Sequence, residues 1–325
     1  MFIHPSFFLF FSFMLLSMFM TISSNSWLFA WMGLEINLLS FIPIMLKKFN
    51  KYNTESAIKY FLVQVIASVF IIFSFLFIKS NFNIIIFLAL MMKMGASPFH
   101  QWLPSISDGL SWPAILMTLV MQKLNPLILT TFMFKTEDLI FVLQVFIISS
   151  ALVGSVGGLT QSSLRKIMVF SSISHLSWVL SSMLVSNWAW FNYFLLYSLI
   201  LSSLIITLYK TEIMSINDLL TKNKTVYSYI ISISMMSVGG LPPFSGFMPK
   251  LIVVQDLMNN NFNFIMLFLL FSTFISLFFY CRMFVSILFI KSTLNLFFTK
   301  SKKSFFLIFL NSSMLVMPGL FFINM

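Results

Sequence analysis

The chain has 325 residues, of which 59% are hydrophobic and only 8% are charged, whereas roughly 25% of residues are charged in soluble domains. So few charges could not cover the surface of a water-soluble globule, and so much apolar content excludes a disordered chain. At about 20 apolar residues per crossing, a chain of this length provides for about ten to twelve membrane helices.

The net charge of +11 does not indicate a nucleic-acid partner, because most basic residues lie in short loops between apolar runs. The single cysteine, Cys281, excludes an internal disulfide, a cysteine zinc site and an iron–sulfur cluster. No phosphate-binding or dinucleotide fingerprint is present either, since Gly154–Gly158 lacks both the spacing and the lysine. We therefore expect no cofactor and no metal in this chain.

Eleven continuous apolar runs predict an all-α polytopic membrane protein, because they are far too long for the strands of a barrel. The first run lacks a basic segment and a cleavage site before it, so we expect a retained helix and not a signal peptide. The expected helices cover residues 6–22, 26–46, 55–79, 82–102, 109–134, 138–157, 163–184, 187–210, 226–258, 262–288 and 304–322.

The distribution of loop cations predicts the orientation of these helices. Loops on the side of the N-terminus carry twelve basic residues: Lys47, Lys48, Lys51, Arg165, Lys166, Lys210, Lys222, Lys224, Lys291, Lys300, Lys302 and Lys303. Loops on the opposite side carry only Lys79 and Lys135. Because cytoplasmic or matrix loops are enriched in lysine and arginine, the N-terminus is expected on that side and the C-terminus on the other.

An internal repeat is indicated by two segments that share the pattern G-x-x-P-F-x-x-aromatic-(Leu/Met)-Pro, Gly95–Pro104 and Gly240–Pro249. The two lie five helices apart, and because five is odd the equivalent helices must run in opposite directions, as in many transporters. Proline interrupts each helix, although two ordinary proline kinks are the alternative. The expected organisation is an inverted repeat over 1–134 and 135–290, with a C-terminal helix in 291–325.

Ionisable residues lie deep in several apolar runs, where each costs ~2.5–3.5 kcal/mol. Glu35 is near the middle of one run, Lys93 and Lys123 are at the centres of two others, and Lys250 directly follows the second proline motif. Pairing of Glu35 with Lys93 is the one plausible ion pair. A lysine removed from water is pushed towards its neutral amine, so in a wet cavity it can take up and release a proton. Snorkelling to the headgroups is the alternative, and it suits Lys59 better than the central lysines.

Two histidines extend this set. His175 lies among serines in the middle of its run, and His100 follows Lys93 by seven residues. A buried histidine that is merely bonded to a serine is the simpler interpretation of His175. The functional one is a relay with access to each side of the membrane at the broken helices. Its lateral polar line at mid-depth would consist of Lys93, Lys123, His175 and Lys250, with His100 two turns from Lys93 towards the N-terminal side.

Five segments resemble the chain 2 family of NADH–ubiquinone oxidoreductase, the mitochondrially encoded antiporter-like subunits of respiratory complex I, in an arthropod-like version. The resemblance extends over roughly residues 21–290. These segments are Trp31–Asn37, Glu55–Phe61, Lys93–His100, Gln161–Lys166 and Gly239–Phe244.

The resemblance implies proton translocation through Lys93, Lys123 and Lys250, with Glu35 modulating Lys93 through a charge pair. It implies a place in the mitochondrial inner membrane beside chains 4L and 4 and the lateral helix of chain 5, in contact with lipids such as cardiolipin. NADH, FMN, iron–sulfur clusters and ubiquinone would be bound by other subunits. Two alternatives stay open: a free-standing cation/proton antiporter, which would exchange ions without partners, and a purely structural membrane subunit, in which the charges only fix helix packing.

Overall fold

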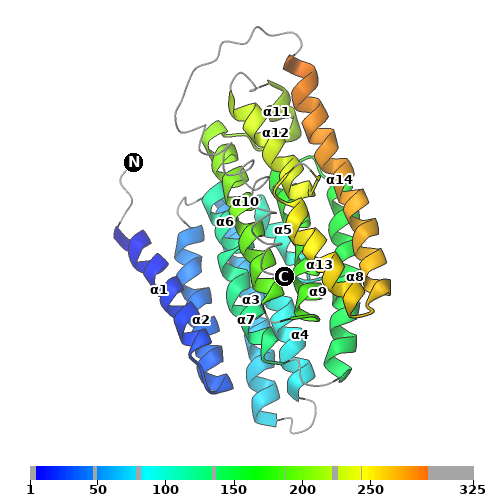
Figure 1. Cartoon of the computed structure of the whole chain (residues 1–325). Helices are drawn as coiled ribbons and strands as arrows, with labels where there is room; N and C mark the ends of the chain where they lie inside the picture. Colours follow the sequence, from blue (N-terminus) through cyan, green and yellow to red (C-terminus); the bar gives the residue numbers. More distant parts are fainter. Residues whose placement is uncertain are drawn as a thin grey trace. The chain divides into compact units, whose positions relative to one another are not determined.

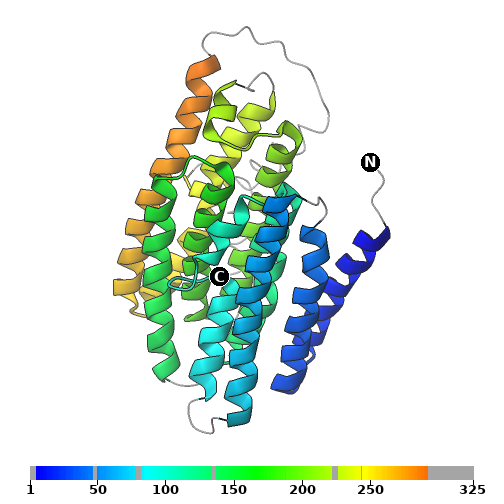
Figure 2. The same ribbon diagram turned by 180° about the vertical axis from the view of Figure 1, so that it is seen from behind.

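The computed structural model describes residues 5–46, 50–77, 82–133, 137–186, 188–221, 226–242 and 244–291. In these ranges every regular element is a helix (Figures 1 and 2). Six of the described helical segments are long and apolar enough to cross a membrane. Without water, a helix satisfies its backbone groups internally, so continuous apolar runs fold in this way.

The chain divides into two compact units at residues 146 and 147. The first unit contains α1 (Pro5–Ile22), α2 (Trp27–Met45), α3 (Lys51–Phe77), α4 (Phe82–Met94), α5 (Trp102–Ser107), α6 (Trp112–Leu119), α7 (Met121–Thr131) and the start of α8 (Glu137–Leu159). Within it, α1 packs on α2, α3 lies between α2 and α4, and α7 contacts both α2 and α4. Phe41 of α2 packs edge-to-face on Tyr60 of α3 in its core, with ring centroids 5.3 Å apart.

The second unit contains the rest of α8 and six further helices: α9 (Leu164–Met183), α10 (Ala189–Thr211), α11 (Ile216–Thr221), α12 (Val226–Gly239), α13 (Phe247–Asn259) and α14 (Asn263–Lys291). Helix α9 is buried along almost its whole length and contacts α10, α13 and α14. Helices α12 and α14 lie side by side in both views (Figures 1 and 2). The exposed side chains of α14 include Phe264, Leu267, Phe271, Phe274 and Phe278, whose spacing gives one apolar face suited to lipid.

The described helices follow the expected runs, with three interruptions and two additions. The runs 82–102 and 226–258 are interrupted at the two proline motifs, and the run 109–134, expected as one helix, is interrupted at Val120. The short helix α11 was not expected, and neither was α5, which lies almost wholly between the runs 82–102 and 109–134. The expected helix over 304–322 lies outside the described residues, as do Lys47, Lys48, Lys79, Lys135, Lys222, Lys224, Pro243, Lys300, Lys302 and Lys303.

Candidate functional site

The first helix break lies directly after Lys93. Helix α4 ends at Met94, and Gly95 follows with a φ of 71°, a left-handed conformation that favours glycine. The backbone N–H groups of Gly95 and Ala96 donate to the carbonyls of Met92 and Met91, at 3.2 and 3.0 Å, which is a Schellman cap. Lys93 therefore lies in the last turn of a helix that stops inside the protein.

Neutral side chains satisfy two carbonyls at this first break. The indole Nε1 of Trp102 donates to the Met92 carbonyl at 3.2 Å, and the Gln64 amide on α3 donates to the Lys93 carbonyl at 3.3 Å. Because a carbonyl left unpaired in a membrane interior is costly, the bond from Gln64 stabilises the interruption, and Trp102 adds a second donor to the carbonyl that Gly95 already serves. They also attach the turn that carries Lys93 to α3 and α5.

Lys123 lies at a second interruption in the same unit. Val120 ends α6 with φ −113° and ψ −69°, and α7 begins at the next residue. Pro126 lies within α7, and because proline has no N–H, the carbonyl of Gln122 loses its usual helical partner. Lys123 thus occupies the first turn of a helix that is irregular on both sides of it.

Lys250 lies at the break between α12 and α13. Gly240 has a φ of 83°, and the N–H groups of Gly240 and Leu241 donate to the carbonyls of Ser237 and Met236, at 3.1 and 3.4 Å, so α12 ends in the same kind of cap as α4. The ammonium of Lys250 donates to the Gly239 carbonyl at 2.7 Å. A cation at a helix C-terminus is favourably placed against the helix dipole.

A cavity of about 230 Å³ adjoins Lys250. Its lining is mostly apolar, with Trp178, Phe247 and Leu251 among the residues that surround the lysine and the glycines of the break. An ammonium has three N–H donors, and the one partner that the described residues supply is the Gly239 carbonyl. The cavity has room for several water molecules that would serve the remaining donors.

The three central lysines share the same environment. Lys93, Lys123 and Lys250 are only 4%, 3% and 8% exposed, so none reaches out of the fold to snorkel. Each lies within four residues of a helix interruption. Non-helical backbone at membrane depth is tolerated where it is buried in protein or lines a wet cavity, which is also where a lysine that exchanges a proton must lie.

Glu35 is half-buried on α2, and its Oε1 is enclosed. Its charge acts through space on Lys93 and on Tyr60. The two described side chains do not approach within the 4.0 Å of a direct ion pair. The expected contact pair is therefore absent from the described side chains, and any interaction between Glu35 and Lys93 acts over a longer distance.

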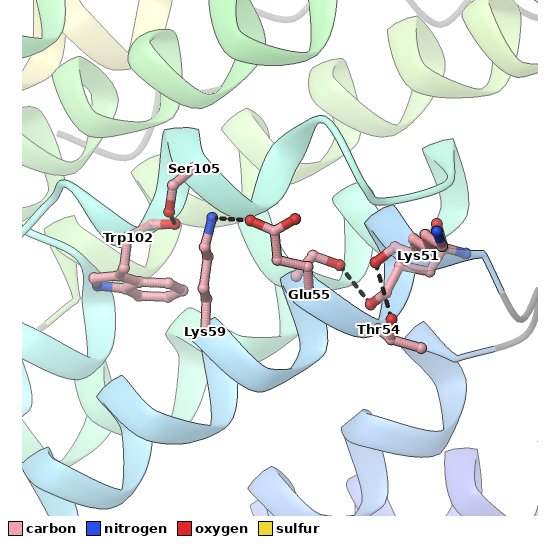
Figure 3. Close-up of polar contacts among 8 residues, drawn as sticks. Lys51, Thr54, Glu55, Lys59, Trp102 and Ser105 are labelled. Carbon is pink, nitrogen blue, oxygen red and sulfur yellow. Dashed lines mark hydrogen bonds and ion pairs between the residues drawn. The ribbon is translucent and has the colours of Figure 1, made fainter.

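Lys59 and His100 lie outside this buried set. Lys59 is exposed on α3 and pairs with Glu55 one turn earlier (Figure 3). His100 is partly exposed in the turn after the first break, where its Nδ1 lies 3.2 Å from the Pro98 carbonyl. The structure thus separates both from the fully buried lysines of the first unit.

His175 is buried in the second unit, and its ring nitrogen Nδ1 lies 2.9 Å from the hydroxyl of Tyr193 on α10. Its ring also stacks at a tilt on Tyr197, with centroids 4.7 Å apart. A small cavity beside it is lined by both tyrosines and by Pro249 of α13. The serines around it, such as Ser174 and Ser177, bond to carbonyls of their own helix.

Arg282 on α14 contacts the end of α8. Its two terminal nitrogens donate to the carbonyls of Leu159 and Gln161, at 3.1 and 3.0 Å, and so cap the C-terminus of α8.

Replacing Arg282 by Met removes both charge-assisted bonds, and we expect it to destabilise the protein by about 2 kcal/mol or more. Thermal inactivation of the assembled complex measures this, and an unchanged inactivation temperature would contradict the capping role.

Sequence reasoning missed one buried polar cluster, formed by Asn37, Tyr60 and Gln122 on α2, α3 and α7. Two amides in the middle of apolar runs were the signal, since buried amides need partners. Tyr193, the partner of His175, was also missed. A tyrosine in an apolar helix indicates only packing until the hydrogen-bond partner of its hydroxyl is known.

The chain is similar to known membrane proteins in both sequence and fold. The family model for the transmembrane region of NADH:quinone oxidoreductase and Mrp antiporters matches residues 24–83 and 78–276. The NADH-ubiquinone oxidoreductase chain 2 of Anopheles gambiae is 42% identical over 281 residues, which are 82% of this chain and 81% of the relative. That of Locusta migratoria is 40% identical over 287 residues, which are 84% and 83% of the two chains. This chain belongs to the NADH-ubiquinone oxidoreductase chain 2 family.

Solved structures show the same fold for this chain 2 family member. A chain of respiratory complex I from Thermus thermophilus with bound aureothin superimposes with a TM-score of 0.84 at 19% identity, over 98% of this chain and 79% of that one. A chain of the Mrp complex from Dietzia superimposes with a TM-score of 0.75 at 16% identity, over 83% of this chain and 58% of that one. The resemblance stated from the sequence motifs, including its arthropod character, is confirmed by the insect relatives.

Proposed function

We propose that this chain is an antiporter-like membrane subunit of a proton-pumping NADH:ubiquinone oxidoreductase and moves protons through Lys93, Lys123 and Lys250. Membership of the chain 2 family supports a multi-pass subunit of that enzyme in the mitochondrial inner membrane. The redox reaction itself, with NADH, FMN, iron–sulfur clusters and ubiquinone, belongs to other subunits in this proposal. This chain supplies titratable side chains at membrane depth.

The observation that carries the proposal is the burial of three lysines at three helix interruptions. A buried lysine exchanges its proton readily because burial opposes its charge, and a helix break provides the backbone dipoles and space that a proton path requires. Glu35, near Lys93 but not locked to it, would shift the charge on Lys93 when its own surroundings change. Buried His175 would extend the path in the second unit, and His100 and Lys59, which lie outside the buried set, would lie at its margin.

The inverted repeat is part of the proposal. Helices α4 and α12 end in the same Schellman cap, at Gly95 and Gly240, which are equivalent in the two proline motifs. This supports repeats over 1–134 and 135–290, each with one broken helix, followed by a C-terminal helix in 291–325 that completes eleven crossings. Each break would then open towards a different side of the membrane.

The orientation and the neighbours follow from the same proposal. The excess of cations in the loops on the N-terminal side favours a matrix-facing N-terminus and a C-terminus in the intermembrane space. The neighbours would be chains 4L and 4 and the lateral helix of chain 5, with lipids such as cardiolipin at the apolar outer faces. Cross-linking from cysteines placed at either terminus, with reagents confined to one side, tests this orientation.

Replacing Lys93 by Met tests the function directly. We expect the enzyme to assemble, but the number of protons pumped per NADH oxidised to fall, because the apolar side chain fills the buried site without carrying a proton. Coupled membrane vesicles that contain the whole complex allow NADH oxidation and acidification to be measured together.

The matched control is Lys51→Met, which removes an exposed lysine at the start of α3 (Figure 3). It should leave both rates at wild-type values. Unchanged proton stoichiometry with Lys93→Met would overturn the proposed path. Loss of assembly without loss of stoichiometry in the remaining complex would favour the purely structural role.

A further inference from the structure

A hydrogen-bonded cluster of three buried side chains joins α2, α3 and α7 in the first unit. The amides of Asn37 and Gln122 pair reciprocally, with distances of 3.1 Å from Asn37 Nδ2 to Gln122 Oε1 and 3.3 Å from Gln122 Nε2 to Asn37 Oδ1. The Tyr60 hydroxyl donates to the same Gln122 oxygen at 2.9 Å. All three residues are buried, Tyr60 and Asn37 almost completely.

The cluster holds the segment that carries Lys123. Gln122 precedes Lys123 directly, in the first turn of α7, and this turn starts at the interruption at Val120. This turn lacks one regular helical hydrogen bond on its C-terminal side, because Pro126 has no N–H to donate to the Gln122 carbonyl. Side-chain bonds from two other helices therefore fix a turn that the backbone alone leaves weakly restrained.

The same face of α3 also reaches Lys93. Tyr60 and Gln64 are four residues apart, so they lie one above the other on the helix. Tyr60 bonds to Gln122 beside Lys123, and Gln64 donates to the carbonyl of Lys93 at 3.3 Å. One helix face thus contacts both lysine-bearing segments of this unit through hydrogen bonds.

Helix α2 enters the cluster through Asn37, two residues after Glu35. The charge of Glu35 also acts on Tyr60 and on Lys93. A shift of α2 would therefore move Asn37 and, through the paired amides, Gln122. Such coupling through a bonded pair does not require Glu35 to touch Lys123.

We propose that Gln122 is a positioning residue for Lys123, and that Asn37 and Tyr60 hold it so that the turn carrying Lys123 follows α2 and α3. This inference rests on the proposed function, because it presupposes that Lys123 carries protons. Neither an amide nor a tyrosine needs to carry the proton itself. Their part is to set the distance from Lys123 to the rest of the path, and a misplacement of about 1 Å at a reacting group is enough to cost about 100-fold in rate.

The test compares protons pumped per NADH oxidised in assembled complexes that carry Gln122→Met, Tyr60→Phe or Lys123→Met. This ratio is independent of how much complex assembles, so a merely structural role would not move it. We expect Gln122→Met to lower the ratio to the value of Lys123→Met, and Tyr60→Phe, which removes one of three bonds, to give an intermediate loss. The double variant Q122M/K123M should show no further loss, as expected for residues that act through one group.

A swapped pair supplies the rescue. Asn37→Gln and Gln122→Asn should each lower the ratio, whereas N37Q/Q122N keeps two amides of the same combined length and should restore at least half of the loss. The matched control is Thr118→Val, which removes a buried hydroxyl that bonds to Ile115 of its own helix at 2.8 Å. It should leave the ratio unchanged.

The outcomes separate the two proposals. If Lys123→Met lowers the ratio but Gln122→Met does not, the positioning role is overturned and the proposed function stands. If Lys123→Met itself leaves the ratio unchanged, the role of Lys123 in the proposed function fails first. A loss with Gln122→Met that the swapped pair does not relieve would also overturn the positioning role.

Discussion

Replacing Lys250 by Met is expected to abolish proton translocation through the second unit and to weaken assembly as well. The Lys250 ammonium both adjoins the cavity and donates to the Gly239 carbonyl at 2.7 Å. Methionine supplies neither a proton carrier nor a donor, so the end of α12 loses its partner at membrane depth. An unsatisfied buried carbonyl costs about 1–3 kcal/mol.

A second substitution separates these two effects. Gln at position 250 keeps a neutral N–H donor of similar reach but does not titrate, so K250Q should assemble normally while pumping stays low. Native gels measure assembly, and acidification of coupled vesicles per NADH oxidised measures pumping. Normal pumping by K250Q would show that this lysine only caps α12, and would remove it from the proton path.

The sequence predicted those parts of the fold that depend on local chemistry. Long apolar runs predicted the helices, and the two proline motifs predicted the interruptions after α4 and α12, because glycine readily leaves the helical conformation and the proline that follows cannot donate a helical hydrogen bond. The burial of Lys93 and Lys123 followed from their central positions in runs of membrane length. In each case the determining residues are neighbours along the chain.

The remaining features depend on contacts between segments far apart in the sequence. Pro126 predicts an irregular helix at its own position, but the helix is interrupted at Val120, six residues earlier. The bond between Asn37 and Gln122 joins residues 85 positions apart, which no spacing rule indicates.

Replacing Gly246 by Ala is expected to disrupt the second unit more than any other single-methyl addition near the break. A Cβ at Gly246 would overlap the carbonyl oxygen of Ser237, a backbone atom in the last turn of α12. Backbone atoms cannot rotate away, so α12 and α13 would have to separate. The start of α13 would move, and with it Lys250, which lies four residues later. We expect a loss of about 3 kcal/mol or more, seen as a large decrease in assembled complex.

Gly239→Ala is the matched control, because it adds the same methyl group to a glycine of the same break. There the nearest atoms are the Leu277 Cδ2 at 3.0 Å and the Tyr280 ring at 3.3 Å, both in side chains that can adjust. This variant should assemble close to normally, since the end of a leucine side chain can move by a few tenths of an ångström. Equal assembly of the two variants would show that the close approach of Gly246 to α12 does not hold the break together.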